Sequence, residues 1–268
     1  MLENWTSGDS NLTSEMVLQV LSRCPQLRTC QLLVNADFDS SRVGQPALEL
    51  PFLHTFDLRY SGPLSPVVRE ICCCISFPKL RDLKLRGKTS DFTSTSCAPF
   101  LAAAPCLDTL AINIEIFSTS LVHFLRALPP ALRSLEINGV HQPWSHYNYN
   151  EIFDDDILDV LIPSPDVPTP SCPGLEVLDL KYPCAISDQG LLRFIRSRTM
   201  KGVAVSFNYG MELDVRGELQ SLLQHGLHLD LKYHEPPPLF ALSPRKGIRH
   251  GLTLIASGAD EDEESGEE

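Results

Sequence analysis

The sequence predicts an α/β fold of repeated units, each with a short strand, a turn and a helix. Two observations in its 268 residues predict this fold. Six times, a proline stands two residues before an apolar residue, and two more apolar residues follow three and five positions later. The first apolar positions recur after 26, 27, 27, 25 and 43 residues. The motifs are Leu27-Cys30-Leu32, Leu53-Phe56-Leu58, Leu80-Leu83-Leu85, Leu107-Leu110-Ile112, Leu132-Leu135-Ile137 and Leu175-Leu178-Leu180.

The clearest unit covers residues 173–196. Its three leucines point to one side of a short strand, because strand side chains alternate between two faces. We expect a turn at residues 182–184 and then a helix, which Ser187 or Asp188 caps. The helix is predicted by the apolar spacing of Leu191, Phe194 and Ile195.

A strand, a turn and a helix in about 26 residues form the pattern of a leucine-rich repeat. Two weaker copies, at 200–205 and 226–231, continue the period, and Leu2 and Trp5 look like the end of one more strand. We expect a leucine-rich-repeat solenoid, a ribonuclease-inhibitor-like horseshoe of about eight repeats over residues 1–235. Its parallel strands would line the concave face and its helices the convex face. Ordinary buried strands of another α/β domain would not explain the constant period.

The one long step, of 43 residues, indicates an insertion within residues 139–172. It carries Trp144, Tyr147 and Tyr149 and ends in a helix predicted at 157–161. Insertions in repeat proteins map to loops, often on the binding face, so these aromatic residues either bind a partner or pack on their own repeat. Beyond the repeats, we expect a C-terminal cap at 236–257 and a disordered acidic tail at 258–268.

Composition limits the class of function. The formal net charge is −12, of which seven negative charges fall within residues 260–268, leaving −5 for the preceding residues. This balance disfavours binding to nucleic acid or to an anionic membrane, because both need basic patches. No apolar run is long enough to span a membrane. Nine cysteines without a Cys-x-x-Cys pair indicate reduced thiols, and hence the cytoplasm or nucleus. We also expect a monomer.

No catalytic constellation is recognisable in the sequence. Gly87-Lys88-Thr89 resembles the end of a phosphate loop, but Asp82 stands where that loop needs glycine. Asp154, Asp155 and Asp156 could bind a cation, but adjacent carboxylates at a helix start point in different directions and usually stabilise the helix dipole. A zinc site at His225, His228 and His234 is a weak alternative. We therefore expect neither an enzyme nor a cofactor or metal.

The variable positions between the apolar residues form columns across the predicted sheet. Three pairs, Asp57 with Arg59, Asp179 with Lys181 and Asp230 with Lys232, are expected either to pair within the sheet or to contact a partner. The first column is Gln31, Asp57, Lys84, Ala111, Glu136, Asp179, Ala204 and Asp230, and the second is Leu33, Arg59, Arg86, Asn113, Asn138, Lys181, Ser206 and Lys232. The candidate partner-binding residues are Asp57, Arg59, Lys84, Arg86, Glu136, Asn138, Asp179, Lys181, Trp144, Tyr147 and Tyr149.

Several motifs resemble one family. Leu175-x-x-Leu178-x-Leu180, with Cys184, Ile186-Ser187-Asp188 and Leu191, resembles the cysteine-containing leucine-rich repeat of F-box proteins, with the cysteine one residue later. Cys24-Pro25-Gln26-Leu27 and Phe77-Pro78-Lys79-Leu80 resemble the repeats of F-box proteins from mushroom-forming fungi. In that family an F-box binds a Skp-type adaptor of a cullin ubiquitin ligase, and the repeats hold the substrate. Because no F-box precedes the repeats in this sequence, the resemblance implies a substrate-receptor half.

We therefore expect a protein-binding module, the substrate-recognition part of an F-box-type ubiquitin ligase receptor. A Skp-type adaptor would join it only where an F-box lies upstream. The first alternative is a free-standing leucine-rich-repeat scaffold. The second is a GTPase-activating protein of the repeat type, which would need an exposed arginine such as Arg59 or Arg86 to act on phosphate.

Overall fold

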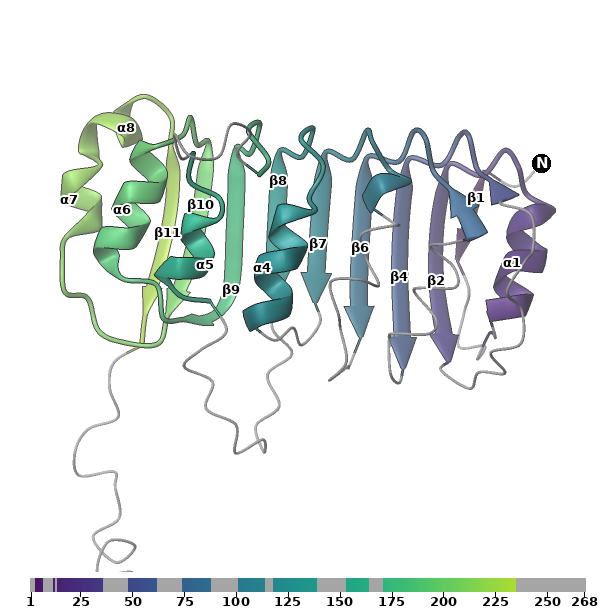
Figure 1. Cartoon of the computed structure of the whole chain (residues 1–268), viewed down its shortest axis with the longest axis horizontal. Helices are drawn as coiled ribbons and strands as arrows, with labels where there is room; N and C mark the ends of the chain where they lie inside the picture. The colour runs from purple at the N-terminus through teal and green to yellow at the C-terminus, as the bar shows by residue number, and fades with distance from the viewer. Residues whose placement is uncertain are drawn as a thin grey trace, which may run out of the picture. The chain divides into compact units, whose positions relative to one another are not determined.

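The computed structural model describes residues 3–6, 12, 14–35, 48–61, 74–87, 101–113, 118–138, 153–163 and 171–234. The chain divides into two compact units, Met1–Tyr233 and His234–Glu268. The first unit is an α/β fold with a parallel sheet and helices (Figure 1). The predicted C-terminal cap and acidic tail lie outside the described residues, as do Trp144, Tyr147 and Tyr149.

Nine parallel strands form the main sheet, and they lie in it in chain order (Figure 1). A smaller parallel sheet pairs β3 (Leu48–Glu49) with β5 (Ile75–Ser76). The main strands are β1 (Asn4–Thr6), β2 (Thr29–Asn35), β4 (Thr55–Ser61), β6 (Asp82–Gly87), β7 (Thr109–Asn113), β8 (Ser134–Asn138), β9 (Val177–Cys184), β10 (Gly202–Phe207) and β11 (His228–Tyr233). The strands predicted from the six motifs and the two weaker copies are confirmed, as is the strand end at Trp5, which belongs to β1.

The apolar motif determines the register of the sheet. The second apolar residues of successive motifs are direct neighbours across the strands, from Cys30 on β2 to Leu229 on β11. A shift by one residue would turn the whole apolar set to the opposite face. The register also passes unchanged from β8 to β9, across the 43-residue step, because Leu135 pairs with Leu178.

The six motif prolines occupy the second position of a tight turn before each strand. In each turn the N–H of the first apolar residue donates to the carbonyl three residues earlier, as from Leu27 to Cys24 and from Leu80 to Phe77, both at 3.1 Å. Proline suits this position because its ring presets φ near −65° and no N–H is needed there. The turn therefore explains why proline stands two residues before the first apolar residue.

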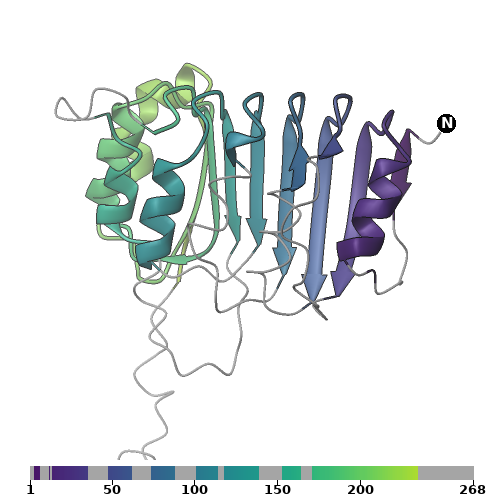
Figure 2. The same ribbon diagram turned by 45° about the vertical axis from the view of Figure 1, so that its right-hand side comes forward.

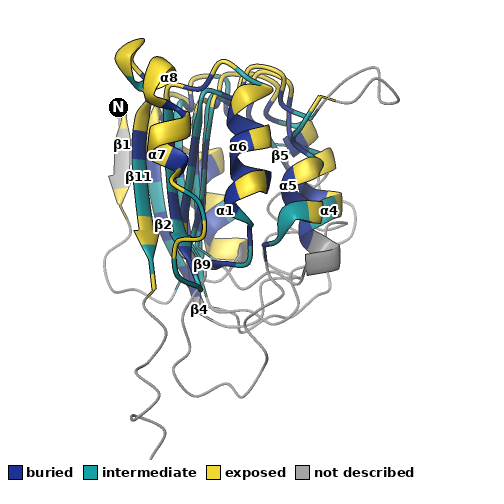
Figure 3. Cartoon of the chain, turned by 90° about the vertical axis from the view of Figure 1, so that its left-hand side faces the viewer, coloured by how far each residue is buried: buried dark blue, intermediate teal, exposed yellow. Residues whose placement is uncertain are grey.

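Helices cover one face of the main sheet. Figure 3 places α1, α4, α5 and α6 on that face, with β5 in the same layer, and Figure 2 shows the strands side by side behind them. The apolar stripes of the helices and the strand leucines are fully buried against each other in one core. No described helix lies on the opposite face of the sheet. The helices are α1 (Ser14–Ser22), α4 (Ser118–Arg126), α5 (Asp155–Asp159), α6 (Asp188–Arg196), α7 (Val215–Glu218) and α8 (Gln220–Gln224).

Two predicted boundaries are wrong. Residues 182–184 are not a turn, because β9 continues through them and Pro183 and Cys184 pair with Ser206 and Phe207 of β10. The helix predicted at 157–161 begins earlier, as α5, because the Asp154 carboxylate accepts the N–H of Ile157 at 3.0 Å and caps it there. The prediction that these carboxylates stabilise a helix start is confirmed.

Candidate functional site

The face of the main sheet opposite the helices carries both predicted columns of side chains, and we call it the open face. Along β6, β7 and β8 its side chains are half-buried and alternate with fully buried apolar residues. The first column is confirmed along its whole length, from Gln31 on β2 to Asp230 on β11. The second column is confirmed from Leu33 to Asn138.

Beyond Asn138 the second column is broken by a bulge in β9. Val205 pairs with Leu180, but Ser206 pairs with Pro183, so Lys181 and Tyr182 are extra residues in this strand. A bulge leaves such residues without a partner in the ladder. The predicted alignment of Lys181 with Ser206 is therefore wrong, whereas Ser206 does align with Lys232 of β11.

Asp57, Arg59, Lys84 and Arg86 form a first group on the open face, the β4–β6 cluster. The Asp57 carboxylate lies 3.5 Å from Arg59 Nη2 and 3.6 Å from Arg86 Nε. Both arginine side chains are more than 40% exposed, whereas that of Asp57 is only 14% exposed. The cluster confirms the predicted pairing of Asp57 with Arg59. Arg59 and Arg86, the two candidates for the arginine of a GTPase-activating protein, therefore each have a carboxylate as neighbour.

Glu136, Asn138, Asp179 and Lys181 form a second group, the β8–β9 cluster. Lys181 Nζ lies 2.7 Å from Glu136 Oε1 and 3.3 Å from Asp179 Oδ2. The Asn138 amide donates to the same Glu136 oxygen at 2.7 Å. The sequence predicted the pair Asp179–Lys181, and the column that contains both Asp179 and Glu136 offered a signal for the second contact. Two of its polar contacts are short, both to Glu136, while Asn138 Oδ1 is buried without a hydrogen-bond partner among the described residues.

The contacts within the β8–β9 cluster shift the pKa values of its charged groups. Partial burial by itself would raise the pKa of Glu136, but hydrogen bonds from Lys181 and Asn138 and the charges of Lys181 and Lys84 bring this pKa below its usual value. The hydrogen bond to Glu136 and the neighbouring Asp179 raise the pKa of Lys181, although partial burial opposes this. Both groups are thus held in their charged forms at neutral pH.

Polar contacts of another kind lie at the C-terminal end of the sheet. The buried Asp188, first residue of α6, accepts the N–H groups of Glu212 and Leu213 at 2.9 and 2.8 Å and the hydroxyl of Tyr233 at 2.8 Å. Burial, followed by this hydrogen bond, raises the pKa of Tyr233. The sequence indicated Asp188 only as one of two possible helix caps, and the cap is in fact Ser187. The bonds of Asp188 instead join three segments of the fold.

The described ends of the insertion pack among the helices. Asp155 of α5 accepts the N–H of Ser187 at 2.8 Å and its hydroxyl at 2.5 Å. A Cβ on Gly190 would lie 2.2 Å from the Asp155 carboxylate, so glycine is required there. Arg198 donates to the carbonyls of Leu161, Ser171 and Cys172, and so holds both edges of the segment between 163 and 171.

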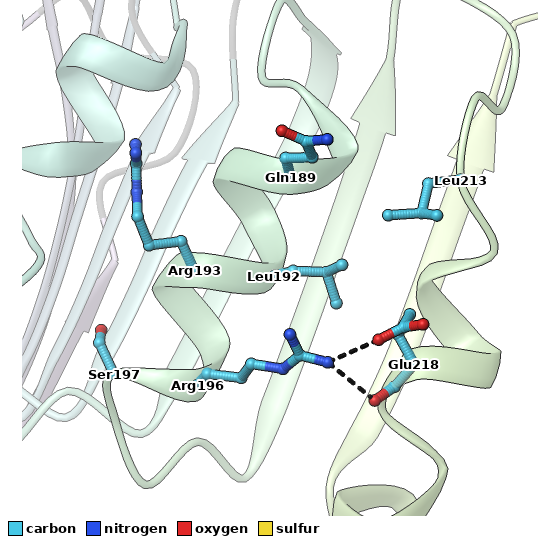
Figure 4. A pocket seen from close by; sticks show the side chains of 7 residues that line it. All are labelled: Gln189, Leu192, Arg193, Arg196, Ser197, Leu213 and Glu218. Atoms are coloured by element: carbon cyan, nitrogen blue, oxygen red, sulfur yellow. Dashed lines mark hydrogen bonds and ion pairs between the residues drawn. The ribbon is translucent and has the colours of Figure 1, made fainter.

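A surface pocket of about 650 Å³ lies beside α6 and α7 (Figure 4). Its two arginines have partners: Arg196 donates to Glu218 at 2.7 Å, and Arg193 donates to Asp159 at 2.5 Å. The pocket contains no cysteine or histidine, and its lining residues are Gln189, Leu192, Arg193, Arg196, Ser197, Leu213 and Glu218. Its arginines and its glutamate thus serve contacts between helices.

Other reactive groups in the described residues do not form a site. Burial raises the pKa of the Cys30, Cys172 and Cys184 thiols to about 12, so they stay protonated and act as small apolar groups. No group of three or more His, Cys, Asp or Glu residues with the geometry to hold a metal ion occurs in the described ranges. In the same ranges, no helix has both the length and the apolar character needed to cross a membrane.

Within the described residues, the two predicted columns therefore lie on the same surface, the open face. Its β4–β6 and β8–β9 clusters contain all eight charged and amide residues that the sequence proposed for the sheet. A comparison of the sequence with models of known protein families finds no match, and a comparison with curated proteins finds none either.

Proposed function

We propose that this chain is a protein-binding module that recognises its partner through the open face. The observation that carries the proposal is the open face itself. It is a continuous row of parallel strands with ordered charged side chains, over which no described helix packs. An apolar sheet face must be buried against another layer of the fold, whereas a face with charged side chains can stay exposed. A continuous sheet face of this kind suits a protein surface better than a small molecule, which binds in concave pockets.

We further propose that the fold is a leucine-rich-repeat solenoid with the open face as its concave side. The constant step between motifs and the strand order of the sheet support this proposal. Repeat solenoids stack identical units on their neighbours and use their extended concave surface for binding. The repeated proline turn, found in six units at the same motif position, is further support.

The resemblance of Leu175-x-x-Leu178-x-Leu180 and its following residues to F-box repeats supports a more specific role. In this role the chain is the substrate-recognition part of an F-box-type ubiquitin ligase receptor. It would act by proximity, holding a substrate close to a separate ligase without reacting with it. Cytoplasmic or nuclear placement follows from reduced thiols and belongs to the same proposal.

A paired capture experiment tests the proposal. Tagged wild-type chain and a variant with Asp57, Arg86, Glu136 and Lys181 replaced by alanine are incubated with native lysate under proteasome inhibition, and bound proteins are identified by mass spectrometry. Circular dichroism of both proteins controls for folding. We expect a set of partners that binds the wild type and is lost from the variant.

The same experiment separates the roles. A Skp-type adaptor and a cullin among the bound proteins support the ligase receptor. Partners that depend on the open face, without adaptor and cullin, favour the free-standing scaffold. Partners that bind wild type and variant equally contradict a role for the open face.

A further inference from the structure

We infer that the β4–β6 cluster binds an acidic side chain presented by an extended segment of the partner protein, whereas the β8–β9 cluster stabilises the sheet. This inference rests on the proposed function and names the part of the open face that makes the strongest contact. Asp57, Arg59, Lys84 and Arg86 carry it.

The first argument is that the β4–β6 cluster leaves most of its donors unused. Its ion-pair distances of 3.5 and 3.6 Å exceed the range of a good N–H···O hydrogen bond. Asp57 Oδ1 and Arg59 Nε are shielded from solvent and have no hydrogen-bond partner in the described structure. Native proteins satisfy nearly all such groups, and an exception calls for an explanation. A ligand carboxylate can accept from Arg59 Nε, and a backbone N–H of the same extended segment can donate to Asp57 Oδ1.

The second argument is the local charge. Two cations, Arg59 and Arg86, pair with one carboxylate, Asp57, and Lys84 is the neighbour of Asp57 on β6, although its charge also acts on Glu136. The neighbour of Lys84 on β7 is the small Ala111, and the next residue in the column is Glu136 on β8. The whole chain carries −12, so an anion gains nothing from the overall field. Attraction of an anion to this face must come from the cluster itself.

The third argument is the row of donors. Arg59, Arg86 and Asn113 are direct neighbours on β4, β6 and β7, so they cover about 10 Å at the usual strand spacing. A guanidinium group binds a carboxylate through two parallel N–H bonds. The amide of Asn113, at the end of the row, matches a backbone carbonyl of the same extended segment. A carboxylate on a peptide therefore fits the row better than a free carboxylic acid.

The β8–β9 cluster also holds one buried atom without a hydrogen-bond partner among the described residues, Asn138 Oδ1, but its cation is already paired at short distance. Lys181 is already held at 2.7 Å by Glu136 and at 3.3 Å by Asp179, and the Asn138 amide also donates to Glu136. A ligand would have to break short charge-assisted bonds to reach these groups. The two clusters are thus equally visible in the sequence but unequal as binding sites.

The test uses the full chain and short fluorescein-labelled peptides with a glycine–serine background. One peptide carries two adjacent glutamates, and matched peptides carry two glutamines or two lysines. Fluorescence anisotropy measures binding to the wild type, to an Arg59→Gln/Arg86→Gln variant and to a Lys181→Gln/Lys232→Gln control. Both variants lose two positive charges from the open face, and thermal unfolding verifies that each is folded.

We expect saturable binding of the glutamate peptide alone, weakened about tenfold in the arginine variant and less than twofold in the lysine control. Equal binding of glutamate and glutamine peptides, or equal losses in both variants, would overturn the inference. A partner whose capture survives the arginine replacements but not replacement of Glu136 and Lys181 would also overturn it, while the proposed function would stand. If capture survives every replacement on the open face, the proposed function fails as well.

Discussion

Asp188 at the start of α6 and Asp57 on the open face are both sheltered carboxylates, but their surroundings differ. Asp188 accepts three hydrogen bonds of 2.8 to 2.9 Å from two backbone N–H groups and a tyrosine hydroxyl. Asp57 has two arginine neighbours at 3.5 and 3.6 Å, and its Oδ1 accepts no hydrogen bond within the described structure. One carboxylate is saturated by its own chain and the other is not.

The difference separates structural from recognition chemistry. A saturated carboxylate links segments far apart in sequence, and removing it leaves several donors unpaired. A loosely paired carboxylate among exposed arginines contributes little to stability, since exposed ion pairs are weak. It leaves the guanidinium donors available to another molecule.

The largest effect is expected for Asp188→Ala. The N–H groups of Glu212 and Leu213 and the hydroxyl of Tyr233 lose their acceptor, so we expect a loss of about 3 kcal/mol in the free energy of unfolding. Urea unfolding measures it. The control is Asp214→Ala, which removes an exposed helix cap on α7 and should cost about 1 kcal/mol. Equal losses in the two variants would contradict a special role for Asp188.

Arg198→Met is the second change. Methionine keeps much of the apolar stem but removes the bonds to the carbonyls of Leu161, Ser171 and Cys172. We expect a loss of about 2 kcal/mol in the free energy of unfolding. Arg193→Met, which breaks only the exposed pair with Asp159, should cost less than about 1 kcal/mol. Guanidinium denaturation curves of both variants give the comparison, which fails if Arg193→Met is the more damaging.

Asp57→Asn should change the free energy of unfolding by less than about 0.5 kcal/mol, because its two ion pairs are long and their arginines are exposed. The measurement is the same urea titration as for Asp188→Ala. A loss as large as that of Asp188→Ala would show that Asp57 is structural. The distinction between a structural Asp188 and a loosely paired Asp57 would then be wrong.

The smallest effect concerns pH. The pKa of Glu136 is lowered in the folded chain, so its charged form contributes stability above the unfolded pKa near 4.5, and this contribution is lost as pH falls through the lowered value. Wild type should exceed Glu136→Gln by about 0.5 kcal/mol at neutral pH. The difference should vanish well below pH 4.5. Thermal unfolding of both proteins at the two pH values tests this, and a gap that widens in acid would contradict it.

Much of the fold could be predicted from the sequence, because alternating apolar residues fix both the strand and the face it buries. Cys30, Phe56 and Leu83 stand side by side as the motif requires. The bulge at Lys181 could not be predicted, because a repeat period counts residues between strands and does not register extra ones within a strand. Only the pairing with β10 reveals it.

The position of the candidate site could be predicted from the sequence, but the lengths of its ion pairs could not. The columns identified Asp57, Arg59 and Lys181, since strand neighbours follow from register. They did not distinguish a 2.7 Å contact of Lys181 from a 3.5 Å contact of Asp57, which depends on side-chain conformation. Arg198 was missed altogether, because its partners are backbone carbonyls and these leave no signal in the sequence.

The strand order has a mechanical consequence. Each strand of the main sheet is hydrogen-bonded, within that sheet, only to the main-sheet strands that precede and follow it in the chain. The two edge strands are therefore β1 and β11. A force applied to the two ends of this sheet peels one edge strand at a time and never shears all strands together. Stretched in this way, the sheet should unfold strand by strand, so that its length increases in a series of small steps at low force.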